Sequence, residues 1–227
     1  MLHAAFESAR FTRKGFARNP CDLARNQRPK HKPNDPGYPF DVAKEAAFLD
    51  ACKGDRFEAL FVLALDGGMR QGELFGREWR HVNWTRSMID VFQRLTDGED
   101  GLKIGPAKNR RRRSVEVSET TMAALRAHQK AQAGGAGLRS LVFPNEIGGF
   151  LSRQNFDRRD LTRVIETAQA ESEFDFAGHT FHDLRHTCAT LLLTEGEPIT
   201  EGLQAPGPRE PSKHAHHLRE CPAAPGW

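Results

Sequence analysis

Two imidazoles and one guanidinium occur within residues 180–187, a span of about two helical turns. His182 and Arg185 are three residues apart, so on a helix they share one face. Thr180 and Asp183 have the spacing of an N-cap pair, which puts that face at a helix N-terminus, where backbone N–H groups favour an anion. An arginine fork beside an imidazole suits a phosphate group. The alternative is an ordinary surface helix with an exposed His and Arg.

A second candidate for phosphate chemistry is Arg70, which follows a glycine turn. Apolar residues over 55–66 predict a core helix, and Gly67 and Gly68 predict its end. Arg70 then stands at the start of another short helix, which the residues up to Phe75 continue. The pattern places a guanidinium where the chain turns between two helices.

The third candidate is a basic run between two predicted strands. Residues 88–92 and 114–117 read as strands, and turn signals lie between them. We expect a small antiparallel sheet whose last turn presents five cations: Lys108, Arg110, Arg111, Arg112 and Arg113. Charges of this kind also protect sheet edges. Four consecutive arginines exceed that need and favour contact with DNA phosphates.

Composition limits the class of protein. The chain has 227 residues, of which 38% are hydrophobic and 28% charged, as in a globular protein with one large domain or two small ones. The net charge is only +3, so any basic surface is a local patch, and the pI near 8.8 weakly favours nucleic acid. No apolar run has transmembrane length and no signal peptide is evident, so we expect no membrane partner. The four cysteines show no CxxC spacing, which argues against a zinc site or a disulfide framework and favours reduced thiols in the cytoplasm.

The remaining segments predict a mainly α fold with a small antiparallel β-sheet, in the α+β class. Helices are expected from 40 to 54, 118 to 131 and 152 to 170, and the arginines of the last one suit a solvated face: Arg153, Arg158, Arg159 and Arg163. Residues 1–18 suggest a basic amphipathic helix, the remnant of an upstream domain. Residues 19–39 suggest a basic linker, which could lie next to DNA or serve as a flexible tether.

The order of these signals resembles the catalytic domain of tyrosine recombinases, the phage integrase family. The matching motifs are residues 68–74, Lys108 with residues 110–117, and residues 182–187, in the family's order. The resemblance covers roughly residues 40–205. It implies the fold of DNA breaking-rejoining enzymes for that part of the chain, with residues 1–18 as the end of a core-binding domain.

The resemblance also implies roles for the motif residues. Such enzymes attack a DNA phosphate with a tyrosine hydroxyl and form a phosphotyrosyl link. Arg70 and Arg185 would clamp the non-bridging oxygens with forked hydrogen bonds. Lys108 would be the general acid on the leaving oxygen, and His182 would handle the nucleophile's proton or hold a phosphate oxygen.

Two further residues would support this site. Glu73 would orient Arg70, and His186 would be structural. The resemblance implies no metal and no other cofactor, because the arginines supply the positive charge. The implied partner is double-stranded DNA, on which intact family members act as homo-oligomers.

The chain departs from the family after Ala205. The family continues with a Leu-Gly-His-x-Ser segment and, later, the nucleophilic tyrosine, but residues 206–227 contain neither and are rich in proline, which predicts an aberrant, disordered tail. The one tyrosine, Tyr38, precedes every motif and is a poor nucleophile candidate. A metal site at His214, His216 and His217 is disfavoured by their spacing.

A shift of reading frame would explain the tail. Read one base later from Pro206, permitted codons give Leu-Gly-His-Glu-Ser and, further on, Tyr-Ala. We hypothesise that one base was inserted at the boundary of Ala205 and Pro206. Sequencing the coding DNA tests this, because the idea is wrong if no frame there encodes Leu-Gly-His and a downstream tyrosine.

The sequence therefore predicts a recombinase catalytic domain that binds DNA, with salt-sensitive affinity, and does not cleave it. A tyrosine supplied by a partner subunit would change that expectation. One alternative is a non-catalytic DNA-binding or regulatory protein on the same scaffold. Another is a helical interaction domain unrelated to DNA, whose binding would survive neutralisation of residues 110–113.

Overall fold

The computed structural model describes residues 39–98, 101–107, 112–132 and 137–194. The predicted helix over 1–18, the linker apart from Pro39, and the tail over 206–227 lie outside these residues, as do Tyr38 and the three histidines of the tail. No helix in the described part is long and apolar enough to cross a membrane.

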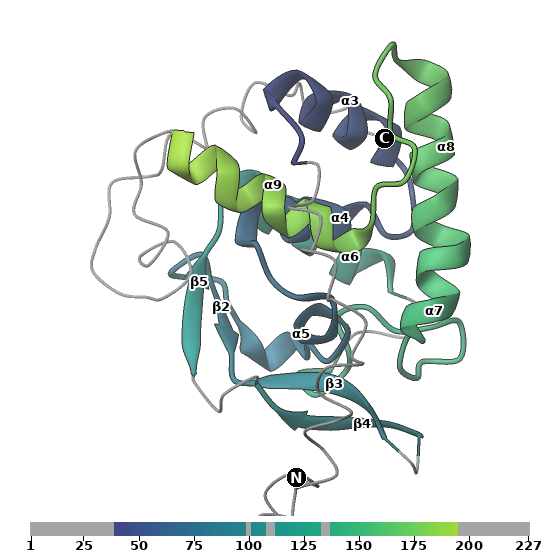
Figure 1. Cartoon of the computed structure of the whole chain (residues 1–227). Helices are drawn as coiled ribbons and strands as arrows, with labels where there is room; N and C mark the ends of the chain where they lie inside the picture. Colours follow the sequence, from purple (N-terminus) through teal and green to yellow (C-terminus); the bar gives the residue numbers. More distant parts are fainter. Residues whose placement is uncertain (1–38, 99–100, 108–111, 133–136, 195–227) are drawn as a thin grey trace, which may run out of the picture. The chain divides into compact units, whose positions relative to one another are not determined.

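The centre of the domain is helix α4, which is apolar on all sides. Every residue from Ala59 to Leu65 is buried, as predicted for a core helix. The helix begins at Glu58, later than the predicted Asp55, because the Asp55 carboxylate accepts a hydrogen bond from the Phe57 backbone N–H and forms a turn there. Helices α3 (Val42–Cys52), α6 (Glu119–Ala131) and α9 (Phe181–Thr194) pack on α4 (Glu58–Gly67). Figure 1 shows α9 in front of α4.

Phenylalanines join these helices into one core. Phe61 of α4 contacts Phe48 of α3 and Phe156, with ring centroids 5.6 and 5.8 Å apart. Phe156 in turn meets Phe181, the first residue of α9, in an edge-to-face contact at 5.8 Å. Since edge-to-face pairs add to the energy of burial, this contact holds the start of α9 against Phe156, which itself packs on α4.

The segment before α3 also contacts α9. The Phe40 backbone N–H donates to Thr187 Oγ1 at 2.8 Å, and that hydroxyl donates to the Asp183 carbonyl one turn earlier at 2.9 Å. The beginning and the end of the described chain therefore meet on one helix.

A three-stranded antiparallel sheet has the order β1-β2-β5. Ile89 of β2 pairs with Val115 of β5, and both side chains are buried. The two strands predicted from the sequence are thus confirmed as neighbours. The strands are β1 (Val82–Asn83), which follows the 3-10 turn η1 (Trp79–His81), β2 (Met88–Val91) and β5 (Arg113–Glu116).

The stretch between β2 and β5 differs from the prediction. The sequence suggested only turns there, but β3 (Gln93–Gly98) and β4 (Gly101–Pro106) pair as a second antiparallel sheet. Almost every residue of β4 is exposed and two are glycines. Such a strand lacks the alternation of apolar and polar residues by which strands are recognised. The α+β prediction itself is confirmed.

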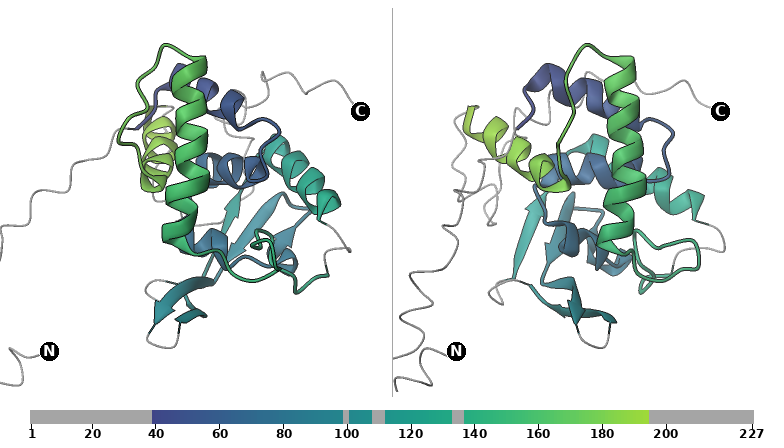
Figure 2. Two further views of the ribbon diagram at one scale, coloured as in Figure 1. Left: turned by 90° about the vertical axis from the view of Figure 1, so that its right-hand side faces the viewer. Right: turned by 45° about the vertical axis from the view of Figure 1, so that its right-hand side comes forward.

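The predicted helix over 152–170 is confirmed as three joined pieces, which Figures 1 and 2 show as one continuous rod. In the π-helical middle piece, Asp157 accepts a hydrogen bond from Gln71 Nε2 at 2.5 Å. Arg163 forms ion pairs with Asp55 and Asp160, so it is more than a solvated charge. The pieces are α7 (Arg153–Phe156), η3 (Asp157–Leu161) and α8 (Thr162–Glu171), and α8 packs on α3.

Glycine at position 72 lets the short helix α5 (Gln71–Phe75) approach β3. A Cβ atom on Gly72 would lie 2.8 Å from the Leu95 carbonyl oxygen, which is backbone and unable to move aside. We expect Gly72→Ala to lower the free energy of unfolding by about 1–3 kcal/mol, as overpacking does. Urea titration measures this. Gly67→Ala is the matched control, because its Cβ would meet side chains no closer than 3.5 Å, and an equal loss in both variants would contradict the explanation.

Candidate active site

Arg70 immediately precedes α5, directly after the turn that ends α4. Gly68 takes a left-handed conformation with φ of 53°, which glycine adopts without strain, and Arg70 follows in an extended conformation as the N-cap. The Arg70 backbone N–H donates to Glu73 Oε2 at 3.0 Å. The Arg70 side chain remains 40% exposed, so its guanidinium is available at the surface.

Glu73 is the buried anion of the site. Its side chain is 1% exposed and accepts a forked pair of hydrogen bonds from Arg113, with Nη1–Oε1 and Nη2–Oε2 distances of 3.0 and 2.6 Å. Arg70 Nη1 lies farther away, 3.4 Å from Oε1. Burial acts to raise the pKa of Glu73, but the hydrogen bonds and charge of Arg113, together with Arg70, hold that pKa below its usual value. Glu73 is therefore ionised at neutral pH.

Arg77 supports this arrangement from inside the fold. Its side chain is fully buried, and it donates to the Glu73 carbonyl at 3.1 Å and to the Asp90 carbonyl. Burial lowers the pKa of Arg77 to about 10, so it stays protonated at neutral pH. No pattern in the sequence indicated this role for Arg77. Arg77 ties the α5 region to strand β2.

Helix α9 brings the second arginine to the same turn. Asp183 accepts hydrogen bonds from the Thr180 backbone N–H at 2.7 Å and from the Thr180 hydroxyl at 2.8 Å, which confirms the predicted N-cap pair. Arg185 then donates to the Gly68 carbonyl. Its pKa is lowered by burial first and then by the positive charges of Arg70 and Arg113. The structure thus brings Arg70 and Arg185 together.

The two histidines of the motif lie on the same helix. The rings of His182 and His186 meet edge to face with centroids 4.6 Å apart. Burial, then the neighbouring His186 and Arg185, lower the pKa of His182. His182 is exposed and neutral at pH 7, so it can accept a proton from a bound group.

The basic run is divided by the structure. Lys108, Arg110 and Arg111 lie outside the described residues. Arg112 is exposed and its guanidinium lies over the Phe92 ring, 5.6 Å from the centroid. Arg113 instead turns inward to Glu73. A sequence signal for this existed, because Arg113 is two residues before the apolar Val115, and alternate residues of a strand share a face.

The resulting cluster has an excess of positive charge. The guanidinium groups of Arg70 and Arg113 contact the carboxylate of Glu73, and that of Arg185 interacts with it electrostatically. Forked donors with excess positive charge suit a phosphate group. Among the described residues, no group of three or more His, Cys, Asp or Glu side chains is placed to hold a metal ion.

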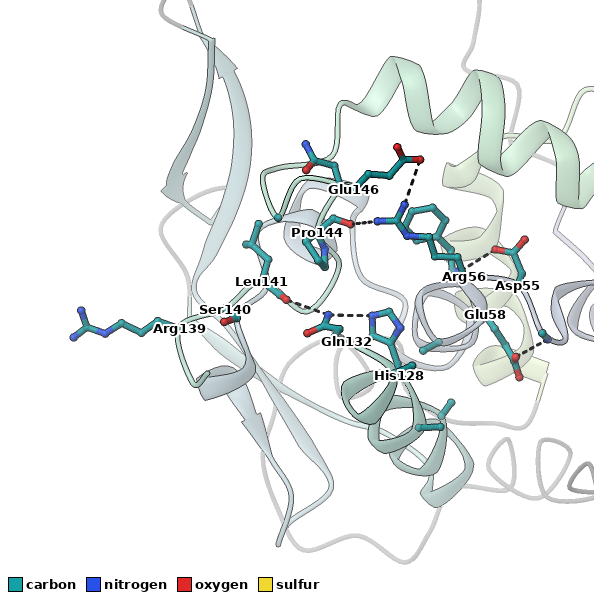
Figure 3. A pocket seen from close by; sticks show the side chains of 18 residues that line it. Asp55, Arg56, Glu58, His128, Gln132, Arg139, Ser140, Leu141, Pro144 and Glu146 are labelled. Atoms are coloured by element: carbon teal, nitrogen blue, oxygen red, sulfur yellow. Dashed lines mark hydrogen bonds and ion pairs between the residues drawn. The ribbon is translucent and has the colours of Figure 1, made fainter. Parts of the chain in front are cut away.

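A separate cavity of about 910 Å³ lies between the loop before α4, helix α6 and residues 139–148 (Figure 3). Arg56 crosses it and donates to the Pro144 carbonyl at 2.8 Å. His128 of α6 contacts the Val142 carbonyl through Nε2 at 2.7 Å. None of the described residues that line this cavity belongs to the arginine cluster, so the two features are independent.

A family model described as "Phage integrase family" matches residues 41–204, which is most of the chain. The chain belongs to the phage integrase family. Its fold is that of a tyrosine recombinase catalytic domain.

Relatives of this integrase-family chain include a protein described as tyrosine recombinase XerC-like from Caldanaerobacter subterraneus, 25% identical over 207 residues, with 81% of this chain and 51% of the relative covered. The tyrosine recombinase XerC of Xanthomonas campestris is 30% identical over 144 residues, which cover 63% of this chain and 38% of that protein. The integrase-family chain thus spans about half or less of the length of these relatives.

Solved structures share the integrase-family fold. The Tn1549 transposon integrase, in complex with a circular intermediate DNA, matches with a TM-score of 0.72 and 21% identity over 88% of this chain and 68% of that one. XerA recombinase matches with a TM-score of 0.57 and 18% identity over 86% of this chain and 61% of the other.

Proposed function

We propose that this domain binds double-stranded DNA and holds one backbone phosphate between Arg70 and Arg185. The observation that carries the proposal is the hydrogen bond from Arg185 to the Gly68 carbonyl, which joins the two arginine motifs at one turn. Family membership supports it, and so does the likeness to an integrase solved in complex with DNA. The acidic group of the site, Glu73, is already neutralised by Arg113, which leaves positive charge for an incoming phosphate.

The other motif residues take the roles that family membership implies. Neutral His182 takes up a proton or donates a hydrogen bond to a phosphate oxygen. Glu73 orients Arg70, and Lys108 would act as the general acid where a partner subunit supplies the nucleophile. His186 supports His182 through the ring contact. The protein acts in the cytoplasm, where it assembles on DNA as a homo-oligomer.

The chain forms no covalent link to DNA by itself in this proposal. Its one tyrosine, Tyr38, precedes all the motifs. The family match ends at residue 204, next to the boundary at which we place the frameshift. The resulting function is phosphate recognition without strand cleavage, unless a partner subunit supplies the nucleophile.

We expect Arg70→Gln and Arg185→Gln each to weaken binding of the full chain to a duplex by about tenfold or more, since each removes charge-assisted hydrogen bonds. Fluorescence anisotropy with a labelled duplex measures this, and the affinity should fall steeply with salt. Arg163→Gln is the matched control, because its charge is already paired with Asp55 and Asp160. Equal affinities for all four proteins would disprove the phosphate clamp.

The absence of cleavage is tested on a pool of nicked duplexes with a randomised core, so that no target sequence has to be known. Incubation followed by denaturing electrophoresis should show no adduct that resists detergent. An adduct would overturn this part of the proposal and make the chain an active recombinase.

A second candidate function is that of a DNA-binding regulator on the same scaffold, which the lack of a tyrosine after the motifs favours. Such a regulator would bind phosphate through the same two arginines, but its coding sequence would carry no frameshift. An intact coding sequence without a recoverable Leu-Gly-His frame would support the regulator.

A further inference from the structure

The closest ion pair of the site joins Glu73 to Arg113 and not to Arg70. Arg113 reaches the two carboxylate oxygens at 3.0 and 2.6 Å, whereas Arg70 Nη1 lies 3.4 Å from Oε1. The Arg113 side chain is 13% exposed, so this fork is largely shielded from water. The carboxylate is thus shared unequally between a buried arginine and a surface arginine.

We propose that Arg113 is a positioning residue that keeps Arg70 available for a phosphate. This inference rests on the proposed phosphate clamp. A buried carboxylate needs a charged partner, and Arg113 meets that need from β5. Arg70 can therefore leave the carboxylate of Glu73 for a phosphate without stranding a buried charge. Without Arg113, the carboxylate would draw Arg70 inward and compete with the phosphate for it.

The competing role for Arg113 is direct contact with DNA, as part of the basic run. The strand geometry argues against it, because Arg113 shares a face with the buried Val115. Arg112, the preceding residue, is exposed. The two roles differ in one measurable way. A positioning effect of Arg113 passes through Glu73, whereas a direct contact does not depend on residue 73.

A double-mutant cycle separates the roles, with affinity for a labelled duplex as the measurement. Arg113→Gln should weaken binding by about tenfold in the otherwise unchanged chain. In the Glu73→Gln background, the same substitution should change the affinity by less than about twofold, because no carboxylate remains to capture Arg70. An undiminished loss in that background would overturn the proposal and assign Arg113 to direct contact.

Arg112→Gln is the matched control. If it weakens binding, it should do so by the same factor in both backgrounds, because no contact of Arg112 with Glu73 occurs in the described structure. If Arg113→Gln alone fails to fold, the affinities of Glu73→Gln and of the double variant for the duplex still distinguish positioning from direct contact. Both lack the buried carboxylate, and unequal affinities between them would refute the positioning role.

The failure of the proposed function is recognised separately. If the unchanged chain does not bind the duplex, inorganic phosphate is used as the ligand in place of the duplex. The measurement is then the rise in melting temperature that phosphate causes at constant ionic strength. Phosphate stabilisation that is lost in Arg113→Gln and kept in the double variant supports the positioning role without DNA binding. Absence of phosphate stabilisation in the unchanged chain refutes both proposals.

Discussion

Replacing Arg77 with Met is expected to lower the free energy of unfolding by about 3–5 kcal/mol, because one buried and one part-buried carbonyl group lose their donor at once. Those carbonyls belong to Glu73 and Asp90, and the Arg77 side chain that reaches them is fully buried. Methionine has similar length but no donor. Urea titration should show a lower midpoint with an unchanged slope, which identifies a loss of stability and not of compactness.

Two further variants make the Arg77 result specific. The free energy of unfolding of Arg77→Lys should lie between those of the unchanged chain and Arg77→Met. An ammonium group keeps the charge but lacks the planar fork that reaches both carbonyls. Arg80→Gln, three residues away, removes an exposed arginine that pairs with Glu78 at 2.8 Å, and should cost less than about 1 kcal/mol. If Arg77→Met is as stable as the unchanged chain, the hydrogen bonds of Arg77 are not what joins α5 to β2.

Acidification should destabilise the domain well before carboxylates titrate. His81 is buried, and its Nδ1 accepts the Glu78 backbone N–H at 3.2 Å. Burial, followed by the charge of Arg77, lowers the pKa of His81 from 6.5 to about 4, with Glu78 and Asp90 acting in the opposite direction and Arg80 in the same one. Below about pH 6.5 the His81 imidazole therefore binds a proton in the unfolded chain, but in the folded chain it stays neutral until about pH 4.

The sign and size of the acid effect follow. Stability is unaffected above the unfolded pKa, falls as the pH drops towards the folded pKa, and levels off below it. From neutral pH to about pH 5 the expected loss is about 2 kcal/mol. Urea titration at a series of pH values measures it. In His81→Phe, the free energy of unfolding should depend less on pH. The pH dependence that remains is assigned to His128 and His182, whose pKa values burial also lowers. An unchanged slope would exclude His81 as the cause.

Local patterns predicted those parts of the fold that depend on neighbours in sequence. The helix expected over residues 40–54 is α3, and Asp41 caps it by accepting from the Lys44 backbone N–H at 2.8 Å. The cap of α9 and the strand pair also followed from spacing. The exposed strand β4 did not, because its pairing with β3 leaves no pattern of burial in its residues.

The site was harder to predict because its contacts are distant in sequence. Arg185 and Gly68 are 117 residues apart, and only the resemblance to a family joined their motifs. Arg113 was grouped with the rest of the basic run, although its partner Glu73 lies 40 residues earlier. No sequence pattern predicted the burial of Arg77, because an arginine is buried only where carbonyl groups are placed to accept its hydrogen bonds.

The distance in sequence between Arg185 and Gly68 has a consequence for how the domain folds. The contact closes a loop that contains most of the described chain, and loops of that length close late, after local helices and hairpins have formed. A chain whose last described helix has not yet docked holds only half of the phosphate clamp. On the proposed function, the two-arginine phosphate site is therefore completed only late in folding.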